Sequence, residues 1–187
     1  KYPKLHVSFV LILAVFFLFP IKTNRIIFTS YNGKQYSCNP KAIYEHIIKK
    51  NQDNIYNLEV IWAFTDVEQF TCSNLESAKT VRYKSFKYIY YVLTSKVVIE
   101  NSESWSIIPK RHGQIVINTW HGGGAYKKVG KSRIDGSRYN DKNVEYKNDR
   151  VNIYVSSSEV FTKTTLRKSF GYSGDVLEIG MPRNDML

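Results

Sequence analysis

A histidine, three glycines and two lysines follow one another closely in the middle of the chain, and together they could hold and activate a phosphate-containing substrate. They come directly after the apolar residues 115–117, a run typical of a strand. A histidine at the end of a strand exchanges protons near neutral pH and would face a cleft. Glycines permit positive φ and leave no Cβ in a ligand's way, so their N–H groups could turn towards an anion. The candidate residues are His121, Gly122, Gly123, Gly124, Lys127 and Lys128.

Two interpretations of this stretch remain open on spacing alone. A glycine cluster after a strand is often only a tight turn, and a single histidine is more often structural than catalytic. The stretch also lacks the lysine-serine ending of a P-loop and the spacing of a dinucleotide fingerprint. The residue types therefore favour a phosphate site and a plain turn about equally.

The same residues resemble the motif of a known family. Trp120, His121 and Gly122, followed by the basic residues 127–130, are similar to the tryptophan-histidine-glycine motif of the CDP-glycerol glycerophosphotransferases, which make teichoic acid and related capsule polymers. In that family a threonine usually follows histidine-glycine, whereas this chain has Gly123. Any role that needs a hydroxyl at this position is therefore in doubt.

Further stretches agree with this resemblance, and in the same order. Residues 27–33 and 39–40 are similar to the family's opening strand and loop, and residues 156–158 lead towards residues 180–185. These last residues resemble the family's glycine-x-proline-arginine-asparagine-aspartate signature. The likeness covers about residues 20–187, nearly the whole chain.

The resemblance implies a GT-B architecture of two Rossmann-like domains, of which this chain is the N-terminal, acceptor-side half without the C-terminal donor-binding domain. It implies a transferase in which a hydroxyl of a polyol-phosphate or lipid-linked acceptor attacks the β-phosphate of CDP-glycerol, CMP leaves, and His121 is the general base. CDP-glycerol is then a donor substrate, and neither a cofactor nor a metal is expected. The residues implied to bind substrate are Asn32, Gly33, Gly122, Gly123, Gly124, Lys127, Lys128, Ser156, Ser158, Arg183, Asn184 and Asp185. Arg183, Asn184 and Asp185 could instead fix the hinge between the two halves.

Composition limits the partners. The chain has 187 residues, and 27 Lys and Arg against 16 Asp and Glu leave a net charge of +11, which favours polyanions or an anionic membrane surface. The basic residues are spread along the chain, so nucleic acid is the less favoured partner. Cys38 and Cys72 have no CxxC spacing and no histidine cluster around them, so we expect reduced thiols and no metal site.

Strand-like and helix-like stretches alternate, which predicts an α/β fold with a Rossmann-like, doubly wound parallel sheet. The expected strands are residues 24–31, 58–64, 80–83, 96–100, 115–120, 151–155 and 176–179, and the expected helices are residues 40–50, 85–95 and 159–169. We expect Asn39 to cap the first helix, Ser158 to cap the last, and Gly171 to end it. The aromatic residues 86–91 should pack against the sheet. The polar residues 127–150 are expected to form a solvated loop, or a segment that orders around an anionic substrate.

The N-terminal residues 7–21 are apolar apart from Ser8 and Pro20, and basic residues flank them. A helix of this length reaches roughly 20 Å, short of the ~30 Å hydrocarbon core of a bilayer. We therefore expect residues 1–22 to be an interfacial membrane-associating segment on the cytoplasmic face of the plasma membrane, and residues 23–187 to be the Rossmann-like domain. A signal peptide and a buried core helix are the alternatives.

Three other functional classes stay open. The first is a sugar-nucleotide glycosyltransferase of the GT-B fold, and the second is a non-catalytic module that binds membranes or polyanions. The third is a nucleic-acid-binding protein, which should show the steep salt dependence of phosphate contacts. The sequence leaves the alditol of the donor undetermined. Because the chain starts at Lys1 and stops just after residues 180–185, we also expect it to be part of a longer protein.

Overall fold

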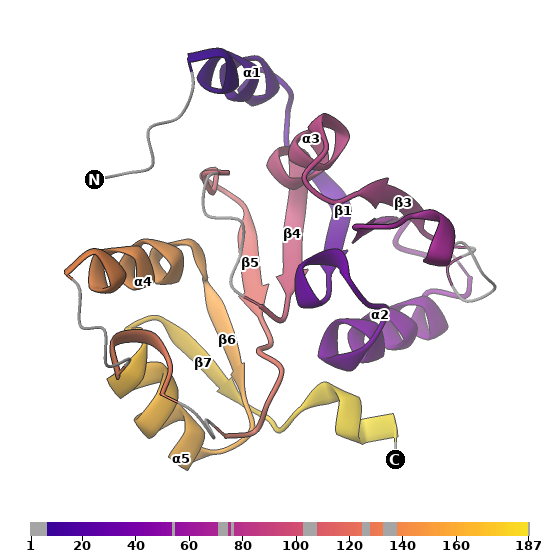
Figure 1. Cartoon of the computed structure of the whole chain (residues 1–187). Coiled ribbons are helices and arrows are strands. Elements are labelled where there is room, and N and C mark those ends of the chain that lie inside the picture. Colours follow the sequence, from indigo (N-terminus) through magenta and orange to yellow (C-terminus); the bar gives the residue numbers. More distant parts are fainter. Residues whose placement is uncertain are drawn as a thin grey trace.

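A computed structural model describes residues 7–53, 55–70, 75, 77–102, 108–124, 128–132 and 138–186, which form an open α/β sheet with helices on both faces (Figure 1). The strands are β1 (Lys22–Thr29), β2 (Glu59–Phe64), β3 (Lys79–Arg82), β4 (Ser95–Glu100), β5 (Ile115–Asn118), β6 (Ile153–Ser156) and β7 (Asp175–Glu178). The helices are α1 (Val7–Phe17), α2 (Cys38–Lys50), α3 (Phe86–Thr94), α4 (Arg138–Arg150) and α5 (Glu159–Phe161), the last continuing as the π-helix η4 (Thr162–Ser169). Short 3-10 turns are η1 (Tyr31–Gly33), η2 (Glu68–Phe70), η3 (Gly130–Ser132) and η5 (Pro182–Met186).

The described strands form one sheet in the order β3-β2-β1-β4-β5-β6-β7, and every neighbouring pair is parallel. The chain builds outward from β1 to β3, returns to place β4 on the other side of β1, and then continues to β7. The order therefore reverses between β1 and β4. In doubly wound sheets, ligands bind outside the carboxyl ends of the strands at such a switch point. The predicted α/β class and parallel sheet are confirmed.

Each face of the sheet has its own core. On one face α2 covers a stack of aromatic rings in which the Trp62 ring lies 5.2 Å from Phe28 and 5.6 Å from Phe64. The opposite face packs against α1, α3, α4 and α5 with its continuation η4, through residues such as Leu93 and Leu166, both fully buried. The strands carry apolar residues towards both faces, as central parallel strands require.

The structure corrects two of the expectations about local structure. Residues 127–150 are not simply a loop, because they contain α4, which packs Val144 and the buried Asn148 and Arg150 towards the sheet. Asn39 does not cap the first helix either. Ser37 occupies the cap position without a side-chain cap bond, whereas Asn39 is completely buried and bonds to a distant strand end. The caps expected at the last helix are confirmed, since Ser158 accepts the N–H of Phe161 and Gly171 follows the helix at φ +66°.

The aromatic residues of α3 only partly follow the expectation that they pack on the sheet. Tyr88 and Tyr91 are buried in the core, but Phe86 is exposed. Tyr90 packs edge to face against Phe16 and Phe19, at ring distances of 5.9 and 5.4 Å. This residue therefore joins α3 to the N-terminal segment as well as to Arg25 of β1, whose guanidinium lies 5.4 Å from its ring.

Helix α1 packs on α3 through one of its sides, and its other side is exposed to solvent. Leu13 is in the core, and Leu11 and Leu18 are 61% and 83% exposed. Arg111 holds the end of α1, because its guanidinium donates to the carbonyls of Phe17 and Phe19 at 3.0 and 2.7 Å. Within the ranges that the structure describes, no helix is both long and apolar enough to cross a membrane.

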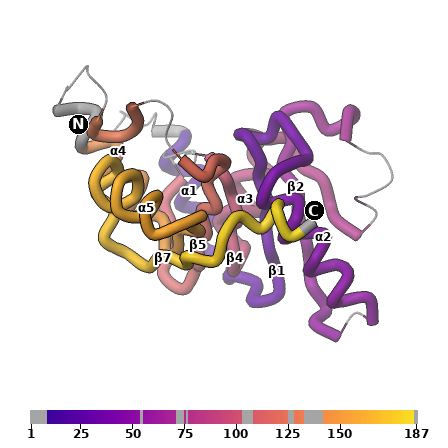
Figure 2. Tube along the Cα trace, turned by 90° about the horizontal axis from the view of Figure 1, so that it is seen from below, coloured from indigo at the N-terminus to yellow at the C-terminus, as the bar shows by residue number. Residues whose placement is uncertain are grey.

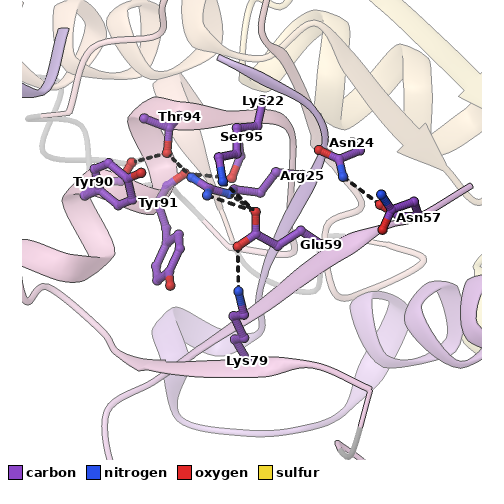
Figure 3. Close-up of polar contacts among 10 residues, drawn as sticks. All are labelled: Lys22, Asn24, Arg25, Asn57, Glu59, Lys79, Tyr90, Tyr91, Thr94 and Ser95. Atoms are coloured by element: carbon purple, nitrogen blue, oxygen red, sulfur yellow. Dashed lines mark hydrogen bonds and ion pairs between the residues drawn. The ribbon is translucent and has the colours of Figure 1, made fainter. Parts of the chain in front are cut away.

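A buried arginine bonds to residues near the amino ends of several strands (Figure 3). Arg25 is 2% exposed, and its Nε and Nη2 both lie 2.9 Å from a carboxylate oxygen of Glu59. The guanidinium also lies 5.0 Å from the Tyr91 ring and donates to Thr94. Lys79 approaches the other oxygen of Glu59 at 2.9 Å. Burial alone would raise the pKa of Glu59, but the hydrogen bonds from Lys79 and Arg25 outweigh it and lower the pKa to about 2.

Candidate active site

The residues that follow β1, β4 and β5 meet at the switch point, on the side seen in Figure 2. Backbone strain is concentrated here, since Tyr31, Asn32, Cys38 and Trp120 all have positive φ, at 45°, 56°, 64° and 50°. Non-glycine residues in this conformation cost free energy and cluster at functional sites. Together the strain and the topology mark this edge of the sheet as the candidate site.

His121 follows β5 and lies half-buried at this edge of the sheet. Its Nδ1 is 2.7 Å from the backbone oxygen of Asn101, which follows β4. A carbonyl oxygen can only accept a hydrogen bond, so Nδ1 carries the proton, and Nε2 of the neutral ring has a free lone pair. The imidazole also stacks on Trp120 at 4.4 Å and lies 5.5 Å from the Tyr31 ring. His121 is thus packed as a structural histidine would be, and is also in the tautomer that can accept a proton at Nε2.

The turn after β1 needs its glycine. Gly33 has φ +82°, and a Cβ there would come within 2.9 Å of the Tyr83 Cβ and 3.1 Å of the Thr65 nitrogen. The Gly33 oxygen accepts the Thr65 N–H at 2.7 Å, and Asn32 accepts the Tyr83 hydroxyl at 3.3 Å. Both predicted residues, Asn32 and Gly33, therefore shape the turn that carries Tyr31. Burial, reinforced by the Cys38 thiol, raises the pKa of the Tyr31 hydroxyl, so it is a neutral donor near neutral pH.

The glycine loop is open, but not in the way its composition suggested. None of Gly122, Gly123 and Gly124 has positive φ, and the left-handed residue is Trp120, whose N–H is held by the Asn118 side chain at 2.9 Å. A Cβ at Gly124 would meet nothing within 4 Å, and one at Gly123 would only touch Ser157 at 3.5 Å. The glycines therefore leave room for a ligand against the backbone. The positive φ that glycine permits is not used at these three positions.

Asn39 and Arg183 tie the end of β5 to the C-terminal segment. The Asn39 amide nitrogen donates to the carbonyls of Thr119 and Trp120, each at 3.1 Å, and its oxygen accepts the Arg183 N–H at 3.2 Å. The Arg183 guanidinium donates to the His121 carbonyl and to the Cys38 sulfur, both at 3.2 Å. Figure 2 shows this C-terminal segment crossing to lie beside α2. Arg183 therefore contacts His121, and this contact holds the backbone carbonyl of His121.

The other predicted residues that the structure describes are either bonded within the β6–α5 turn or exposed. Ser156 is buried, and its hydroxyl bonds within the β6–α5 turn, where Ser158 caps α5. Ser157, which the sequence did not single out, donates to the Gly123 carbonyl at 3.0 Å. Lys128 is exposed, as are Asn184 and Asp185 in η5. Lys127 and Cys72 lie outside the described residues.

Sequence reasoning missed Tyr31, Asn39, Asn101 and Ser157 as site residues. Asn101 is completely buried, and its side chain accepts the Tyr31 N–H at 2.8 Å while its backbone holds His121. Tyr31, Asn39 and Asn101 follow strand ends or open the next helix, so their positions beside the switch point were the available signal. Their hydrogen-bond partners lie 70 to 81 positions away in several cases, and the sequence carried no signal for those pairings.

Fold and site together define a doubly wound α/β protein with a histidine at its switch point. Residues 11–187 match the family model described as CDP-Glycerol:Poly(glycerophosphate) glycerophosphotransferase. The teichoic acid poly(glycerol phosphate) polymerase of Bacillus spizizenii is 30% identical over 175 residues, which are 91% of this chain and 43% of that protein. The teichoic acid glycerol-phosphate transferase of Staphylococcus aureus is 27% identical over 88% of this chain and 42% of its own length.

Solved structures agree in fold. The wall teichoic acid polymerase TagF, as a histidine-to-alanine variant, superposes with a TM-score of 0.81 at 26% identity, over 96% of this chain and 46% of that one. A histidine-to-asparagine variant of TagF soaked with CDPG gives a TM-score of 0.77 at 25% identity, over 96% and 47% of the two chains.

The chain belongs to the CDP-glycerol:poly(glycerophosphate) glycerophosphotransferase family, as the tryptophan-histidine-glycine stretch predicted. It spans less than half the length of the relatives described above.

Proposed function

We propose that this chain is the acceptor-side half of a transferase that moves glycerol phosphate from CDP-glycerol to a hydroxyl of a teichoic-acid-like or capsule acceptor, releasing CMP. The observation that carries the proposal is the geometry of His121. Its Nδ1 is committed to the Asn101 carbonyl at 2.7 Å, which leaves Nε2 able to take the proton of an attacking hydroxyl. General base catalysis of this kind typically contributes ~10²–10⁴ in rate. Family membership and the TagF soak with CDPG support the donor.

In this proposal the open backbone of Gly122, Gly123 and Gly124 approaches phosphate oxygens, and Lys127 and Lys128, which follow a few positions later in the sequence, supply positive charge. Charge-assisted hydrogen bonds to phosphate are about twice as strong as neutral ones. Donors fixed in place before the reaction stabilise the charge that develops in the transition state. Asn32 and Gly33 shape the turn after β1 that carries Tyr31 beside His121. Arg183 donates from its guanidinium to the His121 carbonyl and so helps to hold the backbone of the proposed base in place.

The donor-binding half of the GT-B architecture is proposed to lie outside these 187 residues, because the relatives are more than twice as long as the segment they share with this chain. We therefore expect the chain alone not to release CMP from CDP-glycerol. The assay is CMP release by the purified chain and by the longer protein at equal concentration. Turnover by the isolated chain would contradict the two-domain proposal.

The donor test compares CDP-glycerol, CDP-ribitol and a nucleotide sugar with the longer protein. CMP release with CDP-glycerol alone supports the proposal. Release with CDP-ribitol alone would make CDP-ribitol the donor in place of CDP-glycerol. This donor is included because the relatives include a poly(ribitol-phosphate) polymerase, 27% identical over 177 residues. Activity with the nucleotide sugar alone would make the protein a glycosyltransferase. Binding of polyanions without any turnover would leave a non-catalytic module.

We also propose that α1 attaches the protein to the cytoplasmic face of the plasma membrane by lying in the interface. Its outer side presents Val10, Leu11 and Val15, Leu18 directly after the helix is also exposed, and Leu13 holds the other side on the core. An exposed apolar helix face on a protein of net charge +11 fits an anionic lipid surface.

Flotation with vesicles of anionic and of neutral lipid tests this attachment. We expect Leu11→Gln with Leu18→Gln to lower binding to anionic vesicles at least about tenfold, because each change removes roughly 1.5–3 kcal/mol of apolar burial. Val160→Gln is the control, since Val160 is 70% exposed but lies on α5. Equal binding by the double variant, or by a chain lacking residues 1–20, would make α1 a core helix only.

A further inference from the structure

Asn101 connects the two elements that meet at the switch point. It is completely buried directly after β4, between the ends of β1 and β5. Its Oδ1 accepts the N–H of Tyr31 at 2.8 Å, and its Nδ2 donates to the hydroxyl of Ser30 at 3.2 Å. Its backbone oxygen accepts the Nδ1 proton of His121 at 2.7 Å. One residue therefore holds both the turn after β1 and the imidazole after β5.

We propose that Asn101 is the positioning residue that selects the tautomer of His121, its side chain fixing the place of its own carbonyl against β1. This inference rests on the proposed role of His121 as the base. The tautomer matters because a neutral imidazole with its proton on Nδ1 can accept at Nε2, whereas the other tautomer cannot. Hydrogen-bonding partners that fix a histidine ring in this way are known to control its reactivity.

The side chain is needed because the backbone on its β1 side is strained. Tyr31 has φ +45°, and its N–H uses the Asn101 amide oxygen as acceptor. Removing that acceptor leaves a part-buried donor unsatisfied, which favours rearrangement of the turn. The main chain at Asn101 would then lose the anchor that holds its carbonyl in line with the imidazole. His121 would be free to carry its proton on either nitrogen.

Ring nitrogen NMR of the 187-residue chain reads the tautomer without any need for activity. The chain has 4 histidines, and the spectrum of His121→Gln assigns the signal of His121 by its loss. At a pH where the ring is neutral, we expect the Nδ1–H tautomer in the unaltered chain, and a mixture with Nε2–H in Asn101→Ala. In the longer protein, Asn101→Ala should lower kcat, though by less than the roughly 10²-fold or larger loss expected when the base itself is removed, with KM for CDP-glycerol nearly unchanged.

Two further variants separate positioning from stability. Asn148→Ala removes another buried asparagine, which bonds to the Phe170 carbonyl at 2.6 Å and to the Tyr154 hydroxyl at 3.2 Å. We expect it to lower the melting temperature but to leave the tautomer and kcat unchanged. Asn101→Asp keeps an acceptor for the Tyr31 N–H, so it should retain the Nδ1–H tautomer, and it serves as the test should Asn101→Ala fail to fold.

A folded Asn101→Ala chain that keeps the Nδ1–H tautomer would overturn the inference, as would loss of that tautomer in Asn101→Asp. Failure of the proposed function has a different signature. In that case His121→Ala would keep its turnover in the longer protein, whatever the NMR shows for the ring.

Discussion

Replacing Glu59 by Gln should destabilise the protein at neutral pH and leave its stability almost unchanged in strong acid. The folded state lowers the pKa of Glu59 from 4.5 to about 2. A depressed carboxyl pKa means that the folded state favours the ionised form. The stabilisation is therefore complete above pH 4.5 and is lost as the pH falls from 4.5 towards 2.

The size of this effect follows from the same values. At about 1.4 kcal/mol for each tenfold step, a fall from 4.5 to about 2 corresponds to about 3 kcal/mol of unfolding free energy. Little of this is lost to solvent screening, because the Glu59 side chain is only 16% exposed and Arg25 is 2% exposed. Removing one partner of such a pair leaves a buried charge without its counterion. For a chain of this size, we expect the melting temperature at pH 7 to fall by roughly 6–12 °C.

The assay is urea unfolding and thermal melting of both proteins from pH 7 to pH 2. The control is Glu145→Gln, since Glu145 is 54% exposed and pairs with Lys131 at 2.6 Å, and an exposed pair contributes at most about 1 kcal/mol. Equal stability of Glu59→Gln and the unaltered chain at pH 7 would refute the reasoning. A deficit that stays constant down to pH 2 would do so too, because it would not come from the carboxylate charge.

Four further substitutions test three glycines and one helix cap by thermal melting. Gly33→Ala should cost about 2 kcal/mol or more, because Gly33 has φ +82° and a Cβ there meets backbone at 3.1 Å. Gly130→Ala should cost more, since its Cβ would lie 2.3 Å from the Ser169 carbonyl oxygen. Gly124→Ala, with nothing within 4 Å, is the control for both and should change stability by less than about 0.5 kcal/mol. Ser158→Ala removes the cap that accepts the Phe161 N–H and should cost about 1 kcal/mol. Equal melting temperatures for Gly130→Ala and Gly124→Ala would show that the close approach at Gly130 is relieved without cost.

The sheet was predictable because its strands carry their own signal. Residues 60–64 and 97–99 are continuously apolar, as strands buried on both faces require, and helix-forming stretches alternate with them. Helix α4 was missed because its sequence is dominated by charged and amide residues. Its packing through Val144 and Asn148 depends on a sheet that only the complete fold supplies.

His121 and its glycines could be predicted from the sequence, but the residues that hold them in place could not. His121 and the glycines form a contiguous stretch, whereas Asn39 reaches Trp120 across 81 positions and Asn101 reaches Tyr31 across 70. An asparagine before a proline also matches a helix cap, and this local pattern hid the tertiary role of Asn39. The strain at Trp120 was equally invisible, because glycines nearby suggested that they would adopt the positive φ instead.

The central claim is tested most directly by measuring the turnover number of His121→Ala in the longer protein, as CMP released from CDP-glycerol in the presence of acceptor, together with its melting temperature. We predict a loss of at least about two orders of magnitude in kcat, with acceptor binding and melting temperature nearly unchanged. His121→Gln should fail as well, because an amide can hydrogen-bond but cannot take the proton. A well-folded His121→Ala protein with near-normal turnover would contradict the claim and leave the loop as a phosphate clamp. A lower melting temperature with turnover intact in the folded fraction would show a histidine that only packs against Trp120.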